Sequence, residues 1–161
     1  MRILLVLVAA LIAGPALAQA NLAQVWSHYG NARFGYELDI PPGFEGHGES
    51  GNGDGQGFYR IEAEQGLVVW GGNLLASFSA EAEDALARAS AENWAVTEQA
   101  VTPQWAGFSG QRDHRVFHQR MILLCDGNSY AAFRAEYNLR DLPAMTNVIA
   151  GLVRSFVPMG C

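Results

Sequence analysis

The chain has 161 residues, half of them hydrophobic and 16% charged, which is enough to bury one sizeable core and excludes disorder for most of the length. All ten basic residues are Arg, and 16 acidic residues bring the formal net charge to −6. An acidic chain without a basic stripe argues against partners such as nucleic acid or an anionic membrane surface.

Residues 1–20 have the pattern of a secretory signal peptide. Arg2 supplies a positive start, an uncharged apolar run covers residues 3–13, and Gly14-Pro15 end that run. Small residues then satisfy the A-x-A rule twice, which predicts cleavage after residue 18 or 20. The run is too short for a membrane span, since a spanning helix needs about 20 apolar residues. We therefore expect a single domain over 21–161, exported as a monomer to the bacterial periplasm or the medium.

The beginning of this domain predicts a lead-in followed by a strand. Residues 21–33 show no clean period, and one helical turn is expected around 25–28. Phe34–Ile40 then alternates apolar and polar side chains, which indicates a half-buried strand, and Pro41-Pro42 stop it.

The stretch 43–57 holds seven glycines, which at about 1 kcal/mol each disfavour a helix or an interior strand and predict a loop. Glu49, Asn52 and Asp54 offer oxygen ligands, and the run Ser50-x-Asn52-x-Asp54-Gly55 resembles the start of an EF-hand calcium loop. The twelfth position, however, is Ile61, where that loop needs a bidentate carboxylate. We therefore favour a turn-rich structural connector, without metal or cofactor, over a calcium site or a loop that contacts a partner.

The rest of the chain alternates strand and helix patterns separated by short polar turns. Ser79 is expected to cap the first helix and Asp141 the second, with Pro143 in its first turn. The order and the tight turns predict an α+β fold with a single antiparallel sheet of about six to seven strands, on which a central helix and a C-terminal helix pack. The expected strands are 57–63, 67–70, 95–101, 105–112, 116–125 and 129–137, and the expected helices are 80–93 and 141–156.

Two cysteines are present, Cys125 and the final residue, Cys161. In an oxidising compartment an even number of cysteines predicts a disulfide, and this one would close a loop of about 37 residues. The alternative, a Cys125 nucleophile with His114 or His118 as its base, leaves the terminal cysteine without a partner. We favour the disulfide.

Three arginines, Arg112, Arg115 and Arg120, follow Trp105 closely and offer a small anion-binding patch for contact with a partner. The simpler interpretation is a rim of charges that balances an acidic chain, so partner contact is a hypothesis.

Two histidines, His114 and His118, lie four residues apart and would share one face of a strand. His114 falls in an expected turn, however, which favours solvent-facing histidines over a metal site. Ser109 is not a nucleophile elbow, because Gly110 follows it directly.

Several segments resemble a known group of proteins: NARFGYELDIPPGF, NGDGQGF, LVVWGGN and WAGFSGQRDHRVFHQRMILLCDG. They are similar to small exported bacterial proteins of the PsbP/Mog-like α+β superfamily, and the resemblance spans most of residues 29–157. It implies a sheet-and-helix scaffold used for binding and assembly, with no shared catalytic residues to transfer.

These observations leave two classes of function open. The first is an exported, non-enzymatic binding or assembly module whose partner is a protein or a small ligand. The alternative is a small periplasmic hydrolase with an unrecognised site, which would require polar residues converging in a concave pocket.

Overall fold

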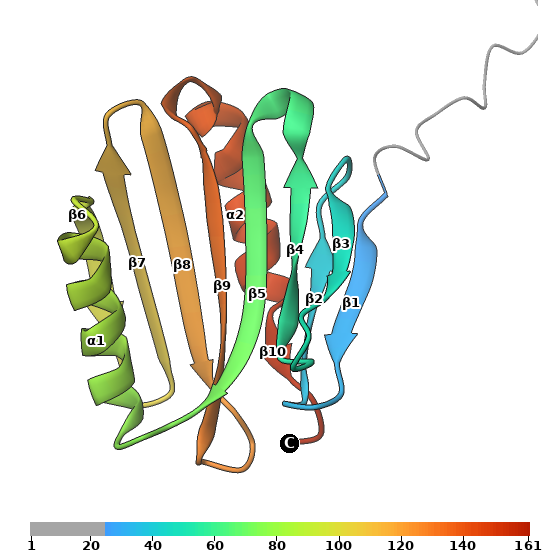
Figure 1. Cartoon of the computed structure of the whole chain (residues 1–161), viewed down its shortest axis with the longest axis vertical. Coiled ribbons are helices and arrows are strands. Elements are labelled where there is room, and N and C mark those ends of the chain that lie inside the picture. The colour runs from blue at the N-terminus through green and yellow to red at the C-terminus, as the bar shows by residue number, and fades with distance from the viewer. Residues whose placement is uncertain (1–24) are drawn as a thin grey trace, which may run out of the picture.

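The computed structural model describes residues 25–161, so the expected signal peptide and its cleavage sites lie outside the described residues. Seven antiparallel strands form the main sheet in the order β3-β4-β5-β9-β8-β7-β6, and a small sheet has the order β1-β2-β10 (Figure 1). The α+β class and the seven-stranded antiparallel sheet are as the sequence predicts, and the small sheet is an addition to them. No helix within residues 25–161 has the length and apolar character that crossing a bilayer requires.

The elements follow one another as strands around two helices. The main sheet consists of β3 (Glu45–Glu49), β4 (Gly55–Arg60), β5 (Gln65–Asn73), β6 (Ala95–Val101), β7 (Trp105–Arg112), β8 (Arg115–Leu123) and β9 (Ser129–Asn138). The small sheet consists of β1 (Ser27–Asn31), β2 (Tyr36–Ile40) and β10 (Val157–Pro158). The helices are α1 (Phe78–Ala91) and α2 (Leu142–Ser155), with short 3-10 turns at Ile61–Ala63 and Leu139–Asp141.

Helix α1 packs on one side of the main sheet, which we call the α1 side. Its buried face is formed by Phe78 and three alanines, and these small side chains let the helix lie close to β7 and β8. The helix begins at Phe78 rather than at Ala80, because Ser77, not Ser79, is its N-cap: the Ser77 hydroxyl accepts a hydrogen bond from the Ala80 N–H at 3.1 Å.

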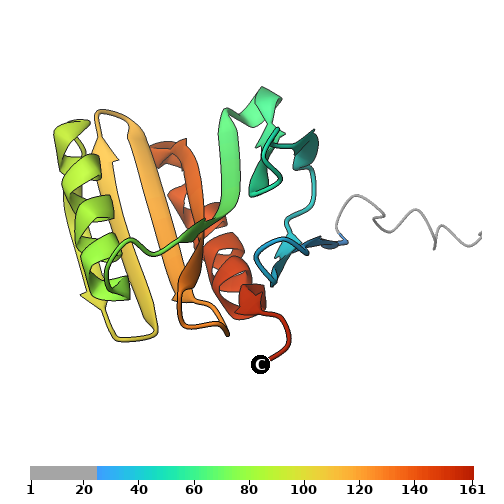
Figure 2. The same cartoon turned by 60° about the horizontal axis from the view of Figure 1, so that its bottom comes forward.

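Helix α2 and the small sheet cover the opposite side, the α2 side (Figures 1 and 2). Leu152 and Phe156 pack there against β2 and against Phe133 of β9. Each helix covers only part of its side of the sheet: α1 lies over β6 to β8, whereas α2 lies over β9 and β2. One half of each side is therefore left without a covering helix.

Two expectations near the start of the domain are wrong. The segment around 25–28 is not a helical turn but leads into β1, where His28 pairs with Asp39 of β2. The stretch 43–57 is not all loop, since it contains β3 and the first residues of β4. Glycines are tolerated in β3 because it is an exposed edge strand, where little side-chain packing is lost.

Candidate functional site

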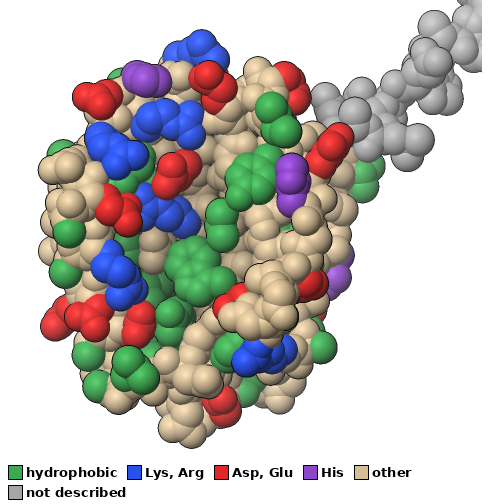
Figure 3. Space-filling view, viewed as in Figure 1, with side chains coloured by type: hydrophobic (Ala, Val, Ile, Leu, Met, Phe, Trp, Pro, Cys, Tyr) green, Lys and Arg blue, Asp and Glu red, His purple; other side chains and the backbone are tan. Residues whose placement is uncertain are grey.

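The uncovered half of the α1 side is formed by β4, β5 and β9, and we call it the open face. Alternate residues of these strands point to this side, and they line a hollow of about 590 Å³. Hydrophobic side chains gather near its centre and arginines along the border with α1 (Figure 3). Its lining includes Tyr59, Ile61, Val68, Arg115, Arg134 and Glu136.

The open face owes its shape to glycines beside an aromatic ring. The Tyr59 ring lies over Gly57 and Gly66, where an added Cβ would come within 2.7 Å and 3.4 Å of its carbon atoms. The flat ring leaves neighbouring apolar side chains accessible: Tyr59 is 37% exposed, Val68 40% and Ile61 73%. This half of the sheet therefore presents an apolar surface that no other part of residues 25–161 covers.

The charged groups on the open face already have partners within the protein. Nε of Arg134 donates to Glu136 at 2.7 Å, and the Arg134 guanidinium lies 4.0 Å from the centre of the Phe117 ring. Nη1 of Arg115 donates to the Glu64 carbonyl at 2.7 Å. What this surface offers to a partner is therefore chiefly apolar area with a polar rim.

The uncovered half of the α2 side holds a smaller groove of about 350 Å³, which we call the Arg120 groove. It runs over β6, β7 and β8 beside α2, and Glu98, Ser109, His118, Arg120, Ile149 and Val153 line it. The Arg120 guanidinium lies 3.9 Å from the centre of the Trp105 ring, and burial lowers the pKa of Arg120.

Glu98, Ser109 and His118 lie side by side on β6, β7 and β8, a juxtaposition that sequence reasoning missed. The short turn at Asp113-His114 could have revealed it, since it fixes the hairpin register that sets Ser109 opposite His118. A Ser-His-acid relay needs the histidine between the other two groups. Here Ser109 is in the middle, with its hydroxyl 3.5 Å from a Glu98 carboxylate oxygen, so the row does not form that relay.

His118 is partly buried beside an aromatic ring. Burial lowers its pKa, against a smaller opposite effect of the Glu98 charge. The imidazole stacks on the ring of Tyr137, with 5.8 Å between ring centres. Burial therefore favours the uncharged form of the imidazole.

The three arginines expected to form one patch are separated by the sheet. Arg112 and Arg115 pair directly across the β7–β8 hairpin and point to the α1 side, whereas Arg120 points to the α2 side. Arg112 stacks on Trp94 at 4.4 Å and donates to the Glu92 carbonyl at 2.8 Å. The single patch is therefore wrong, because strand alternation places these residues on opposite faces. Contact of each arginine with a partner stays a prediction.

The glycine-rich segment holds its polar side chains in an internal network. Glu49 accepts from the Tyr29 hydroxyl at 2.7 Å, and Asp54 accepts from Asn52 at 2.8 Å and from the Ser50 hydroxyl. These hydrogen bonds, led by Ser50, lower the pKa of Asp54. Among the described residues, no group of three or more His, Cys, Asp or Glu side chains is placed to hold a metal ion.

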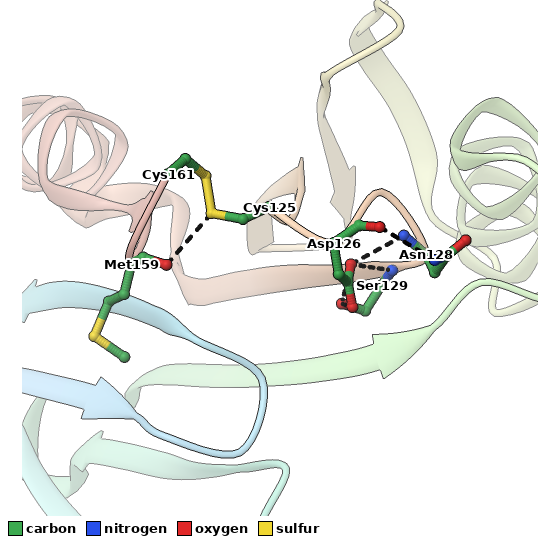
Figure 4. The surroundings of a disulfide bond; sticks show 6 residues. All are labelled: Cys125, Asp126, Asn128, Ser129, Met159 and Cys161. Atoms are coloured by element: carbon green, nitrogen blue, oxygen red, sulfur yellow. Dashed lines mark hydrogen bonds between the residues drawn. A yellow bond between two sulfur atoms is a disulfide. The ribbon is translucent and has the colours of Figure 1, made fainter.

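The two cysteines lie together at disulfide distance, with their Cα atoms 5.5 Å apart (Figure 4). The expected proximity is confirmed, but the expected strand 116–125 extends too far, because Cys125 does not belong to it. Strand β8 ends at Leu123, and Cys125 lies in the exposed turn that follows. Asp126 shapes this turn by accepting the backbone N–H groups of Asn128 and Ser129, each at 2.9 Å.

Comparison with known proteins shows the fold. No family model and no curated protein matches the sequence. Among solved structures, cyanobacterial PsbP (CyanoP) from Synechocystis sp. PCC 6803 superposes with a TM-score of 0.64 at 14% identity, covering 90% of this chain and 99% of its own. The Saccharomyces cerevisiae Ran-binding protein Mog1p superposes with a TM-score of 0.60 at 9% identity, covering 84% of this chain and 96% of its own. The chain therefore has a PsbP/Mog-like α+β fold, as the resemblance in its sequence predicts.

Proposed function

We propose that this protein is an exported, non-enzymatic binding module that takes a partner protein onto its open face. The observation that carries the proposal is the exposed apolar surface of Tyr59, Ile61 and Val68 in a hollow whose charges are internally paired. Contiguous exposed apolar surface with a polar rim is typical of protein interaction sites. One protein of the same fold is named for binding Ran, which supports a protein as the class of partner.

A binding role accounts for the described polar groups better than the alternative of a small hydrolase does. The serine, histidine and glutamate that lie together are in the wrong order for a relay, as described above. The polar groups of the open face are engaged in hydrogen bonds that fix the surface rather than in an arrangement that activates a nucleophile.

Export rests on the signal-peptide pattern of residues 1–20 and on the cysteine pair, which suits an oxidising compartment. Mass spectrometry of the protein from a periplasmic fraction is expected to find a chain that starts at Gln19 or Asn21. A protein that retains Met1 there would contradict export by this route.

The binding proposal is tested with two matched substitutions of exposed valines. Val68 on the open face and Val101 on β6 are 40% and 41% exposed, so Val68→Glu and Val101→Glu introduce the same charge at similar exposure. Proteins captured from a periplasmic extract by the wild type and by Val101→Glu are purified, and their dissociation constants are measured directly by calorimetry.

The expected result is a loss of at least about tenfold in affinity for Val68→Glu, since a charge is buried against an apolar contact, and a change below about twofold for Val101→Glu. Equal affinities of the two variants for every purified partner would overturn the open face as the binding surface. Melting temperatures of both variants establish that they are folded.

A further inference from the structure

The side chain of Arg120 is held in position without a charged partner. It lies beside Gly107, its direct partner on β7: a Cβ at Gly107 would be in ordinary van der Waals contact with Nη1 of Arg120 at 3.7 Å and with the Trp105 ring at 3.8 Å. Within residues 25–161, Arg120 makes neither an ion pair nor a hydrogen bond, whereas Arg88 and Arg134 are each paired with a glutamate. An arginine stays charged even when half buried, so the groove contains an oriented cation with free N–H donors.

The other walls of the groove are chemically distinct from Arg120. Phe133, Ile149 and Val153 form an apolar wall from β9 and α2, and Val153 is 38% exposed. Ser109 and His118 add two further polar side chains to the floor. A volume of about 350 Å³ is that of a site for a small molecule or for the end of a chain.

The charges of the groove favour one class of ligand. A guanidinium binds a carboxylate through two parallel hydrogen bonds, and the apolar wall suits a hydrophobic group attached to that carboxylate. Glu98 on the rim repels a phosphate dianion more strongly than a singly charged carboxylate. β6 is an edge strand beside the groove, so the carboxylate can belong to a small acid or to the C-terminus of an extended peptide.

We propose that the Arg120 groove is a binding site for a carboxylate that carries an apolar group, with Arg120 pairing the carboxylate and Ile149 and Val153 contacting the apolar part. The groove lies on the side of the sheet opposite the open face, so this site is independent of the proposed partner surface. A substitution that removes binding at the Arg120 groove would leave binding at the open face unchanged, and the reverse also holds.

The test is an NMR titration of the mature protein with 4-phenylbutyrate, following the side-chain N–H signals of Arg120 and Trp105. Arg120→Gln removes the cation, and Arg112→Gln is a matched control because it removes the same charge from an Arg–Trp stack on the other side. We expect saturable shifts in the wild type, binding at least about tenfold weaker in Arg120→Gln, and a change below about twofold in Arg112→Gln. The neutral analogue 4-phenylbutanol is expected to bind at least about tenfold more weakly than the acid.

A second pair of variants keeps the test decisive if Arg120→Gln fails to fold. Val153 lies on the accessible surface of α2, where a charged residue is tolerated. Val153→Glu is expected to weaken binding of 4-phenylbutyrate and Val153→Lys to strengthen it, each by about threefold or more. Equal binding by both Val153 variants, or by Arg120→Gln and Arg112→Gln, would overturn the site.

Two peptide probes distinguish the source of the carboxylate. A hexapeptide that ends in Leu is compared as the free acid and as the C-terminal amide. Tighter binding of the free acid than of 4-phenylbutyrate, with shifts along β6, identifies a chain terminus as the ligand. Binding no tighter than that of the small acid identifies a free carboxylic acid.

Discussion

The two layers that cover the main sheet are built from different parts of the chain. The buried residues around α1 come from one continuous stretch, from Phe78 to Ala132. Those around α2 come from both ends of the described chain, from Tyr29 to Val69 and from Ile122 to Phe156. A layer assembled from distant segments closes longer loops and loses more chain entropy on forming. The cysteine pair joins the C-terminal segment to the β8–β9 turn, in the layer where that cost is greater.

Removal of the cysteine pair should affect the α2 layer far more than the α1 layer. For Cys125→Ser combined with Cys161→Ser, we expect a loss of about 4 kcal/mol in the free energy of unfolding, as predicted for a loop of about 37 residues. Denaturant titration measures this loss, and amide hydrogen exchange locates it. Protection should fall more in α2 and β10 than in α1.

The wild type treated with a reductant serves as the control for that double variant. If α1 and α2 lost protection equally, the two layers would not differ in the way their origins suggest.

Two buried tyrosines on the α2 side of the sheet differ in the hydrogen bonding of their hydroxyl groups. Tyr36 and Tyr137 are both fully buried, but the Tyr36 hydroxyl donates to the Asp54 carbonyl at 2.8 Å. The Tyr137 hydroxyl has no hydrogen-bond partner among the described residues, and burial raises the pKa of Tyr137 to about 12.

Replacement by phenylalanine is therefore expected to affect stability differently at Tyr36 and at Tyr137. Tyr36→Phe should lower the free energy of unfolding by about 1 kcal/mol because the hydrogen bond from the Tyr36 hydroxyl to the Asp54 carbonyl is lost, while that carbonyl keeps the Gly71 N–H as a donor. Tyr137→Phe should leave it unchanged or raise it by up to about 1 kcal/mol because an unpaired polar group is removed. Urea denaturation measures both, and an equal loss in the two variants would contradict this account of the hydroxyl groups.

The smallest expected effect is a pH dependence that arises from His118. Because burial lowers its pKa below the ordinary value of 6.5, the folded protein binds this proton less readily than the unfolded chain. The neutral imidazole makes its full contribution to the free energy of unfolding above about pH 6.5. This contribution is lost as the pH falls from there through the lower pKa of the folded state. The stability difference between about pH 7.5 and pH 5.5 should therefore shrink in His118→Gln.

His114→Gln is the control, because His114 lies exposed in the β7–β8 turn. If both histidine variants kept the wild-type pH dependence, His118 would not be its source.

The sequence predicted those elements that have a local residue pattern and missed those that are defined by pairing with a distant strand. Strands β7, β8 and β9 are runs rich in apolar and aromatic residues bounded by short turns, and α2 repeats apolar residues at intervals of three and four. Such patterns are local, so the sequence predicted these elements close to their observed bounds. β1 and β3 are short and rich in polar residues or glycine, and their pairing with β2 and β4 defines them as strands.

The same distinction holds for the candidate sites. Cys125 and Cys161 were predicted to meet from their number and the expected oxidising compartment, since two cysteines allow a single pairing. Arg120 was identified as a candidate, but its separation from Arg112 and Arg115 follows from the side of the sheet to which each residue points.

The sequence by itself determined the α+β class, the main strands, the C-terminal helix and the cysteine pair, because these depend on periodicity, turn residues and composition. The tertiary structure alone decided which half of each side of the sheet is left uncovered, because the packing of α1 and α2 sets the limits of coverage. The open face and the Arg120 groove both result from that packing. Whether a part of the sheet is exposed depends on which elements pack against it, and no local residue pattern records that.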